Sequence, residues 1–147
     1  MALYDGINFR PPQAVAREAI LGLEYRQKAG GRGGLTSRQA AAEGVGSGVQ
    51  RAASLRYRQN QSPETIRRMV AFFSRHERNK EVKPQYRETP WKDAGKVAWL
   101  LWGGDAGRDW AERILRQMEQ SEAQEEARKL RRREARARAA SRPNYRG

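Results

Sequence analysis

The chain has 147 residues and a formal net charge of +13, and 24 of its 30 basic residues are arginines. A charge this strong attracts polyanions, and the planar arginine fork grips phosphate at two points. The lack of cysteine excludes disulfides and thiolate metal sites. No apolar run approaches the roughly 20 residues that span a bilayer, and residues 1–10 do not resemble a signal peptide. We therefore expect a soluble intracellular protein with a small core and no membrane partner.

The basic residues form two zones. Residues 24–87 carry a net charge of +9, and residues 121–147 carry a net charge of +5. Residues 1–23 sum to zero, and residues 88–120, which hold all four tryptophans, sum to −1. The composition thus predicts two polyanion-binding zones separated by a neutral segment.

The chain shows helical periodicity throughout, which predicts an all-α fold of about five to six helices in a small bundle. Pro11-Pro12 can open a first helix that ends at Gly30-Gly31. Its expected inward side chains are Val15, Ala19 and Leu23, with Ile20 beside them.

A short second helix can begin at Thr36 or Ser37 and end at Glu43. Gly44-Val45-Gly46 should break it, and a third helix should follow from Ser47 to Gln59.

The clearest helix start is Ser62-Pro63-Glu64, which supplies a cap, a proline in the first turn and an acid near the positive end of the helix dipole. An amphipathic stripe follows at Ile66, Met69, Val70 and Phe73. The polar residues from Asn79 to Glu88 predict a connector.

Thr89-Pro90 repeats the cap-and-proline start and predicts a central helix that is apolar most of the way round and ends at Gly103-Gly104. Asp105 can cap the next helix. The inward face of that helix should consist of Trp110, Ile114, Leu115 and Met118.

The apolar stripe stops after Met118, although alanine and the charged residues still favour helix. We therefore divide the chain into an N-terminal arm (1–9), a helical domain (10–118) and a charged tail (119–147). The tail is expected to be a solvent-exposed helix that frays toward Pro143.

Residues 36–58 resemble a helix-turn-helix in outline, because a short alanine-rich helix and a Gly-Val-Gly turn precede a helix that carries arginines. In that interpretation Ser47, Gln50, Arg51 and Ser54 would face bases, and Arg56 and Arg58 would contact the backbone. Two helices packed across a tight turn in any small bundle give the same pattern.

The tail from Arg128 to Arg146 has nine basic residues and one acid, which is typical of a nucleic-acid-binding arm. A solvated extension that binds nothing is the alternative, and a self-pairing coiled coil has no apolar heptad to support it. The Gly30–Gly34 loop with Arg32 is similar to arginine-glycine segments that contact single strands or RNA, but its shortness favours a plain flexible linker. The candidate nucleic-acid-binding residues are Arg32, Arg38, Gln50, Arg51, Arg56, Arg58, Arg67, Arg68, Arg131, Arg132, Arg133, Arg136 and Arg138.

Catalytic and metal chemistry finds little support in the sequence. His76 is the only histidine and has no cysteine to join it as a metal ligand, so we assign it a structural polar contact. The helical spacing of the tryptophans favours core packing over base stacking. No phosphate-binding loop, nucleophile elbow or carboxylate pair is present. We expect no enzymatic activity, no cofactor and no metal.

Two segments, Ser62–Met69 continuing through Phe72–Glu77 and Ala94–Gly107, resemble a family of phage-encoded domains. The resemblance covers about Ala14 to Met118 and extends weakly over Gly46–Leu55. Family members occur among phage virion and head-assembly proteins, which implies a phage origin and a place in the host cytoplasm or the virion. The connector after Glu77 departs from the family, where it is acidic and glycine-rich, and the arginine tail lies outside the match.

The leading hypothesis is a non-enzymatic phage protein that binds nucleic acid, DNA ahead of RNA, mainly through phosphates. Two alternatives stay open. One is a structural virion component, such as an internal, connector or capsid-associated protein that contacts other virion proteins. The other is a host-takeover factor that binds a host protein complex.

Overall fold

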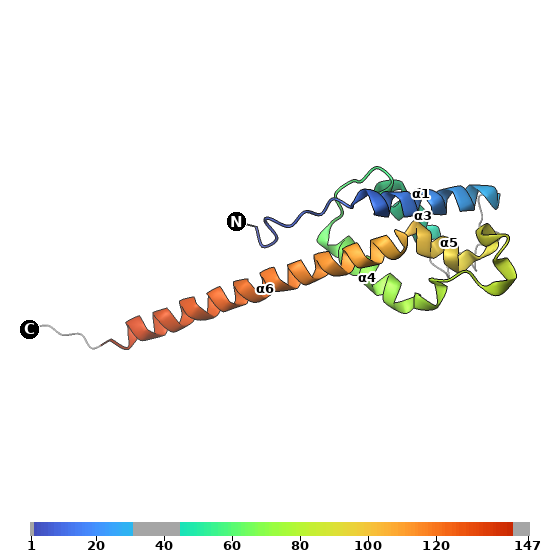
Figure 1. Ribbon diagram of the computed structural model, residues 1–147. Coiled ribbons are helices and arrows are strands. Elements are labelled where there is room, and N and C mark those ends of the chain that lie inside the picture. Colours follow the sequence, from blue (N-terminus) through green and yellow to red (C-terminus); the bar gives the residue numbers. More distant parts are fainter. Residues whose placement is uncertain (1, 31–44, 143–147) are drawn as a thin grey trace, which may run out of the picture. The chain divides into compact units, whose positions relative to one another are not determined.

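The computed structural model describes residues 2–30 and 45–142, and this part of the chain is all-α, without a strand (Figure 1). Its α-helices are α1 (Gln13–Lys28), α3 (Val45–Leu55), α4 (Pro63–Arg75), α5 (Ala94–Leu101) and α6 (Gly104–Ala140). Three short 3-10 turns complete it: η1 (Glu77–Asn79), η2 (Pro84–Tyr86) and η3 (Pro90–Lys92). The expected small all-α fold is confirmed. The predicted helix over 36–43 lies outside the described residues.

Contacts divide the molecule into two compact units. One unit, Asn8–Leu115, holds α1, α3, α4, α5 and the start of α6. The other combines the N-terminal residues up to Ile7 with α6 from Arg116 onward. Every helix in the described residues is too short or too polar to cross a lipid bilayer.

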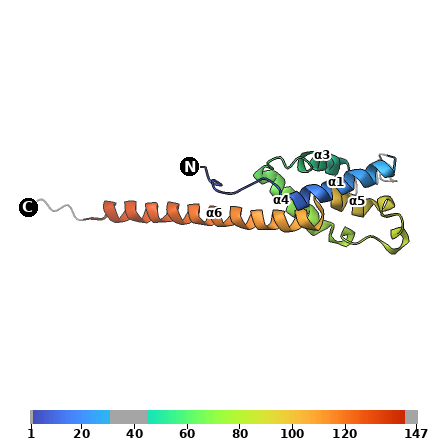
Figure 2. The same cartoon turned by 45° about the horizontal axis from the view of Figure 1, so that its top comes forward.

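Helix α5 is the centre of the first unit, and α1 and α3 both pack against it and against each other (Figure 2). Helices α1 and α3 approach α5 closely because each has a glycine at the point of contact. A Cβ on Gly22 of α1 would lie 2.8 Å from the backbone nitrogen of Leu101. A Cβ on Gly48 of α3 would lie 3.1 Å from the Leu101 Cβ. Both helices therefore press almost directly on the last turn of α5.

The core is aromatic. Trp99 is fully buried, and its ring meets that of Phe73 edge to face at a centroid distance of 4.8 Å. Trp102 is 8% exposed and stacks on Phe72 at 4.7 Å. The expectation that the tryptophans form core holds for Trp99, Trp102 and Trp110, whereas Trp91 is half-buried under the ammonium group of Lys28.

The helix starts are partly as predicted. Ser62 caps α4 by accepting a hydrogen bond from the backbone N–H of Thr65 at 3.1 Å, as its sequence motif indicates. The Thr89-Pro90 prediction is wrong, because it opens only the η3 turn. The true cap of α5 is Asp93, which accepts from the backbone N–H of Lys96. Buried Asp93 also binds the ammonium group of Lys83, and these contacts fix the start of α5 here.

Other predicted boundaries need correction. Val45 and Gly46 belong to α3 rather than to a break, and α3 ends at Leu55 rather than Gln59. Asp105 lies in the first turn of α6, where it accepts from the indole N–H of Trp99, and α6 already begins at Gly104. At Asp105 the contact with Trp99 of α5 replaces the expected capping role.

The side-chain positions follow the predicted faces with few exceptions. Val15 and Ala19 are buried in α1, but Ile20 is 40% exposed, so it does not join the core. The predicted inward residues of α6 are all buried or half-buried. Asn79, placed by sequence in a polar connector, is 1% exposed. The exposed helical extension is confirmed as far as Ala140.

Candidate nucleic-acid interface

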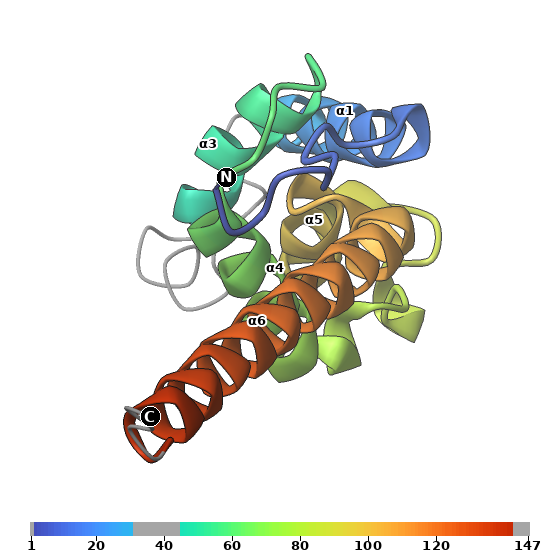
Figure 3. The same cartoon turned by 90° about the vertical axis from the view of Figure 1, so that its left-hand side faces the viewer.

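Helices α3 and α4, together with Trp102 at the C-terminal end of α5, line a basic cavity of about 440 Å³ that is open to solvent on one side. Figure 3 shows α3, α4 and α5 in one view. We call this space the α3–α4 cavity. Its described lining residues are Gln50, Arg51, Arg68, Ala71, Arg75 and Trp102. Three of these are arginines and none is acidic.

Arg51 is the most firmly positioned of the three arginines. Its Nη1 donates to Oε1 of Gln61 at 2.7 Å. Gln61 is 4% exposed and is itself held, because its Nε2 donates to Ser54 Oγ and to the carbonyl oxygen of Gln59, each at 2.8 Å. A buried amide therefore fixes one end of the Arg51 guanidinium group.

The rest of the Arg51 guanidinium group makes no hydrogen bond to a described residue. Its Nε is buried and makes no hydrogen bond. Burial lowers the pKa of Arg51, and the positive charge of Arg68 lowers it further. The free protein therefore carries a cation that is both partly desolvated and repelled by its neighbour, which is unfavourable unless an anion joins it.

Trp102 forms one wall of the α3–α4 cavity. One face of its ring stacks on Phe72 at an interplanar angle of 11°, and the guanidinium carbon of Arg51 lies 6.0 Å from its centroid. Its Nε1 is buried without a hydrogen-bond partner. A Cβ on Gly48 would lie 3.3 Å from that nitrogen, so α3 sits directly beside the indole. The ring thus forms part of the wall and presents no open face for stacking.

Arg68 and Arg75 are seven residues apart on α4, so they lie on the same face two turns apart. Both are exposed. Arg68 pairs with Glu64 at 2.8 Å, but both side chains are more than 60% exposed, and such i,i+4 surface pairs contribute only about 0.3–0.5 kcal/mol. Arg75 makes no ion pair with another described residue. Both groups are thus available to a ligand.

The turn after α3 holds the other two predicted arginines of this region in different ways. Arg58 adopts a positive φ of 53°, and its Nε donates to the carbonyl oxygen of Pro11 at 2.9 Å. This contact ties the turn to the start of α1, so part of the Arg58 guanidinium group is engaged. Arg56 lies over the ring of Tyr57 at 4.6 Å, and Tyr57 is 65% exposed. Arg56 is therefore the more accessible of the two.

The second basic region is the part of α6 from Arg128 to Ala140 and the residues after it up to Arg142, which we call the basic segment. It carries eight basic residues and one acid, and all its residues are exposed. Its described ion pairs join Arg128 and Arg132 to Glu125, and Lys129 to Glu126. Five arginines make no ion pair with a described residue: Arg131, Arg133, Arg136, Arg138 and Arg142.

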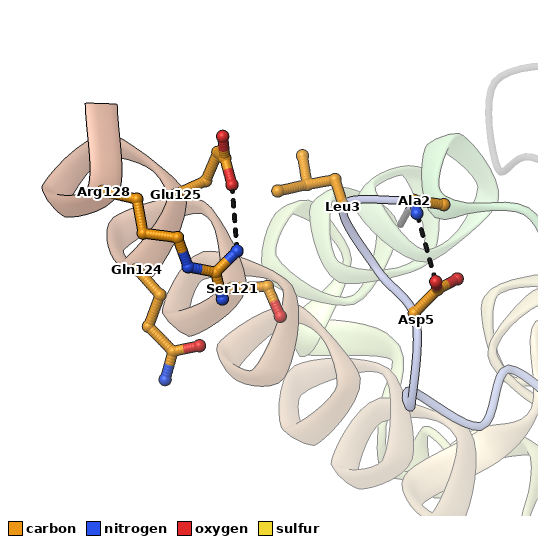
Figure 4. A pocket seen from close by; sticks show the side chains of 7 residues that line it. All are labelled: Ala2, Leu3, Asp5, Ser121, Gln124, Glu125 and Arg128. Carbon is orange, nitrogen blue, oxygen red and sulfur yellow. Dashed lines mark hydrogen bonds and ion pairs between the residues drawn. The ribbon is translucent and has the colours of Figure 1, made fainter. Parts of the chain in front are cut away.

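A second cavity, of about 120 Å³, lies in the same unit as the basic segment (Figure 4). Residues Ala2, Leu3 and Asp5 line it from one side and Ser121, Gln124, Glu125 and Arg128 from the other. Arg128 is bound to Glu125, and the Asp5 carboxylate accepts from the backbone N–H of Ala2. This cavity has two acids for one arginine, so it does not suit an anion.

The predicted binding residues thus fall into separate groups. Gln50, Arg51 and Arg68 come together in the α3–α4 cavity, and the five tail arginines lie along α6. Arg67 is exposed on α4 but is not among the described residues that line the cavity. Arg32 and Arg38 lie outside the described residues, as does the side chain of Ser47, so groove recognition stays a prediction. Sequence reasoning missed Arg75, for which the seven-residue spacing from Arg68 was the available signal.

Other chemistry finds no site among the described residues. No three of their histidine, aspartate or glutamate side chains gather as metal ligands would. His76 ends α4, and its ring lies 4.7 Å from that of Phe72. Comparison of the chain with family models, with curated proteins and with solved structures finds no match. The function must therefore be argued from the chain's own geometry.

Proposed function

We propose that this chain is a non-enzymatic, phage-encoded protein that binds nucleic acid, DNA ahead of RNA, through arginine contacts to phosphates with little base readout. The observation that carries the proposal is the basic segment, where eight basic residues face solvent with only one acid among them. The phage origin rests on the sequence resemblance alone.

The geometry of the basic segment suits a polyanion. The helix rises about 1.5 Å per residue, so Arg128 and Arg138 are about 15 Å apart along it. Duplex DNA carries one charge per about 1.7 Å of axis, so a helix of this length can face several phosphates at once. Arg128, Arg132 and Arg136 follow at i, i+4 and i+8 and so share one face of α6. Because the basic segment is exposed and most of its arginines make no ion pair with a described residue, its binding should be electrostatic and independent of sequence.

The test is a gel-shift titration of the full chain with duplex DNA over a range of salt concentrations. The variant replaces Arg131, Arg132, Arg133, Arg136 and Arg138 by glutamine, which keeps helix propensity. Losing about five phosphate contacts should flatten the slope of log affinity against log salt by about 4 to 5. A wild-type affinity that hardly changes with salt would contradict the proposal.

The matched control replaces the same five arginines by lysine. It keeps the charge and removes the planar fork. Because counterion release depends on charge, the lysine variant should retain the wild-type salt slope, with a modest loss of affinity. Loss of the slope in both variants would mean that damage to α6, rather than charge, explains the result.

Docking to an acidic protein surface is the competing role for the same charge. Pull-down from infected cells with and without nuclease separates the two roles, because partners held through nucleic acid are lost after digestion. Presence of the chain in purified particles, with nuclease-resistant partners, would favour the structural virion role.

A further inference from the structure

The α3–α4 cavity differs from the basic segment in that its arginines converge. Arg51 reaches the cavity from α3, whereas Arg68 and Arg75 reach it from α4. The described lining has no carboxylate, so the positive charges of these arginines repel one another and lower the stability of the unbound protein. Such an arrangement is typical of a site whose missing partner is an anion.

Gln61 holds one end of the Arg51 guanidinium group, and the opposite edge, whose Nε is buried, has no hydrogen-bond partner among the described residues. Nη1 is occupied by Gln61, so the remaining edge consists of Nε and Nη2. Nε has no partner, and no hydrogen bond of Nη2 to a described residue is present. That edge carries two parallel N–H donors, which is the geometry that binds two oxygens of one anion.

We propose that the α3–α4 cavity is a discrete phosphate-binding site, in which a shift of the Arg51 side chain uncovers its Nε and Nη2 edge to bind two phosphate oxygens while Arg68 and Arg75 neutralise the remaining charge. Gln61 is the positioning residue, because it holds the opposite end of Arg51. This inference rests on the proposed function and deepens it, since it assigns one defined phosphate contact in addition to the diffuse contacts of α6.

The size and the walls of the cavity indicate the ligand class. A volume of about 440 Å³ falls within the range of about 300–1,000 Å³ that is usual for small-molecule sites, so the cavity has room for a phosphate with its attached sugar. Phosphate presents oxygens in several directions and so can meet guanidinium groups that arrive from two helices. Trp102 has one ring face covered by Phe72 and is only 8% exposed, so little of its ring is available to a base and the phosphate is the expected contact.

Two sources can supply such a group: the backbone of a nucleic-acid strand or a free phosphate compound. Nuclear magnetic resonance on the full chain separates them by following the Nε–H of Arg51 and the indole N–H of Trp102. The variants Arg51→Lys and Trp102→Phe assign the two signals. The probes are inorganic pyrophosphate, a short oligothymidylate and duplex DNA. We expect saturable shifts of the Arg51 signal with pyrophosphate and with at least one nucleic acid.

Affinity measurements on variants then locate the contact. Arg51→Lys keeps the charge and loses the two-point grip, so pyrophosphate should bind roughly tenfold more weakly. Gln61→Leu should also weaken binding, because it frees Arg51 from its anchor while leaving every charge in place. Arg75→Gln should weaken binding severalfold. The matched control Arg78→Gln removes another exposed charge just past the end of α4 and should change affinity by about twofold or less.

Each outcome decides between defined alternatives. If the chemical shift of the Arg51 Nε–H does not change while duplex DNA binds, the proposal of a phosphate site is wrong and the proposed function is retained. If the signal shifts with pyrophosphate but no nucleic acid binds, the site stands and the proposed function falls. Equal losses for Arg75→Gln and Arg78→Gln would also overturn the site, because the effect would then be net charge. Folded spectra of each variant ensure that a loss reflects binding.

Discussion

Arg51 and Arg136 are the same residue type in the same chain, yet their surroundings differ. Arg51 lies half-buried between helices, with one end of its guanidinium group bound to a buried glutamine. Arg136 stands on an exposed helix without an ion pair to another described residue. In the first arrangement the guanidinium group has a fixed orientation, whereas in the second the side chain supplies only its charge. A basic protein can thus combine a positioned contact with a diffuse one.

The largest expected difference between the core and the basic segment is in the free energy of local opening. Backbone amides of α5 lie in the core and should exchange with solvent only on global unfolding, which costs about 5–15 kcal/mol in typical domains. Amides of α6 beyond Leu130 have no core contact and should open at almost no cost. Hydrogen exchange followed by mass spectrometry measures both. Comparable protection in the two helices would break the comparison and indicate that something covers the basic segment in solution.

Removal of a core ring is the next largest effect. Trp99→Ala deletes a fully buried side chain that also donates to Asp105, so it should cost about 3–5 kcal/mol of unfolding free energy. Denaturant unfolding gives the value. The matched control is Trp91→Ala, which removes a half-buried ring from η3 and should cost clearly less. Equal losses at the two positions would mean that Trp99 is not central to the core.

The cap of α4 gives a smaller effect. Ser62→Ala removes the acceptor for the backbone N–H of Thr65 and should cost about 1 kcal/mol. Ser74→Ala, on the exposed side of the same helix, is the control and should change stability by a few tenths of a kcal/mol at most. Chemical denaturation of both variants measures the difference. A cap loss no larger than the control would show that packing alone fixes the start of α4.

The smallest effect concerns pH. Burial raises the pKa of Glu18 above 4.5, while Lys96 lowers it and Asp105 raises it by a lesser amount. A raised carboxyl pKa favours the folded state in acid, and this contribution is lost as pH rises through the folded-state pKa. Glu18→Gln should therefore melt slightly higher than wild type near neutral pH, with the gap closing toward about pH 4. Glu24→Gln, exposed on the same helix, is the control. A gap that widens in acid would contradict the sign.

Sequence patterns predicted those parts of the fold that depend only on neighbouring residues. The Ser62-Pro63-Glu64 start needs only neighbouring residues, and it holds in the structure. Thr89-Pro90 has a similar pattern but fails, because Asp93 a few residues later makes tertiary contacts as well as a cap. Gly46 lies within a helix despite its low propensity. Its neighbour Gly48 shows the compensation, since it lets α3 approach α5.

The candidate site was only half predictable for the same reason. Arg51 and Arg68 were expected from the clustering of charge, which is visible in the sequence. The bond from Arg51 to Gln61 and the closeness of Arg75 to Trp102 depend on how three helices pack. No spacing rule encodes that packing. The diffuse site along α6 was easier to predict, because charge and helix propensity are sufficient to describe it.

The missing side chain at Gly48 has a practical consequence for anyone who redesigns this protein. The absent methyl group lets the backbone of α3 rest beside the indole nitrogen of Trp102, which sets how far Arg51 can reach. Attempts to retune ligand preference should therefore diversify Gln50, Arg68 and Arg75 and leave that glycine alone. A library that varies Gly48 would move the backbone of α3 as well. A change in ligand preference could then not be told from a change in helix packing.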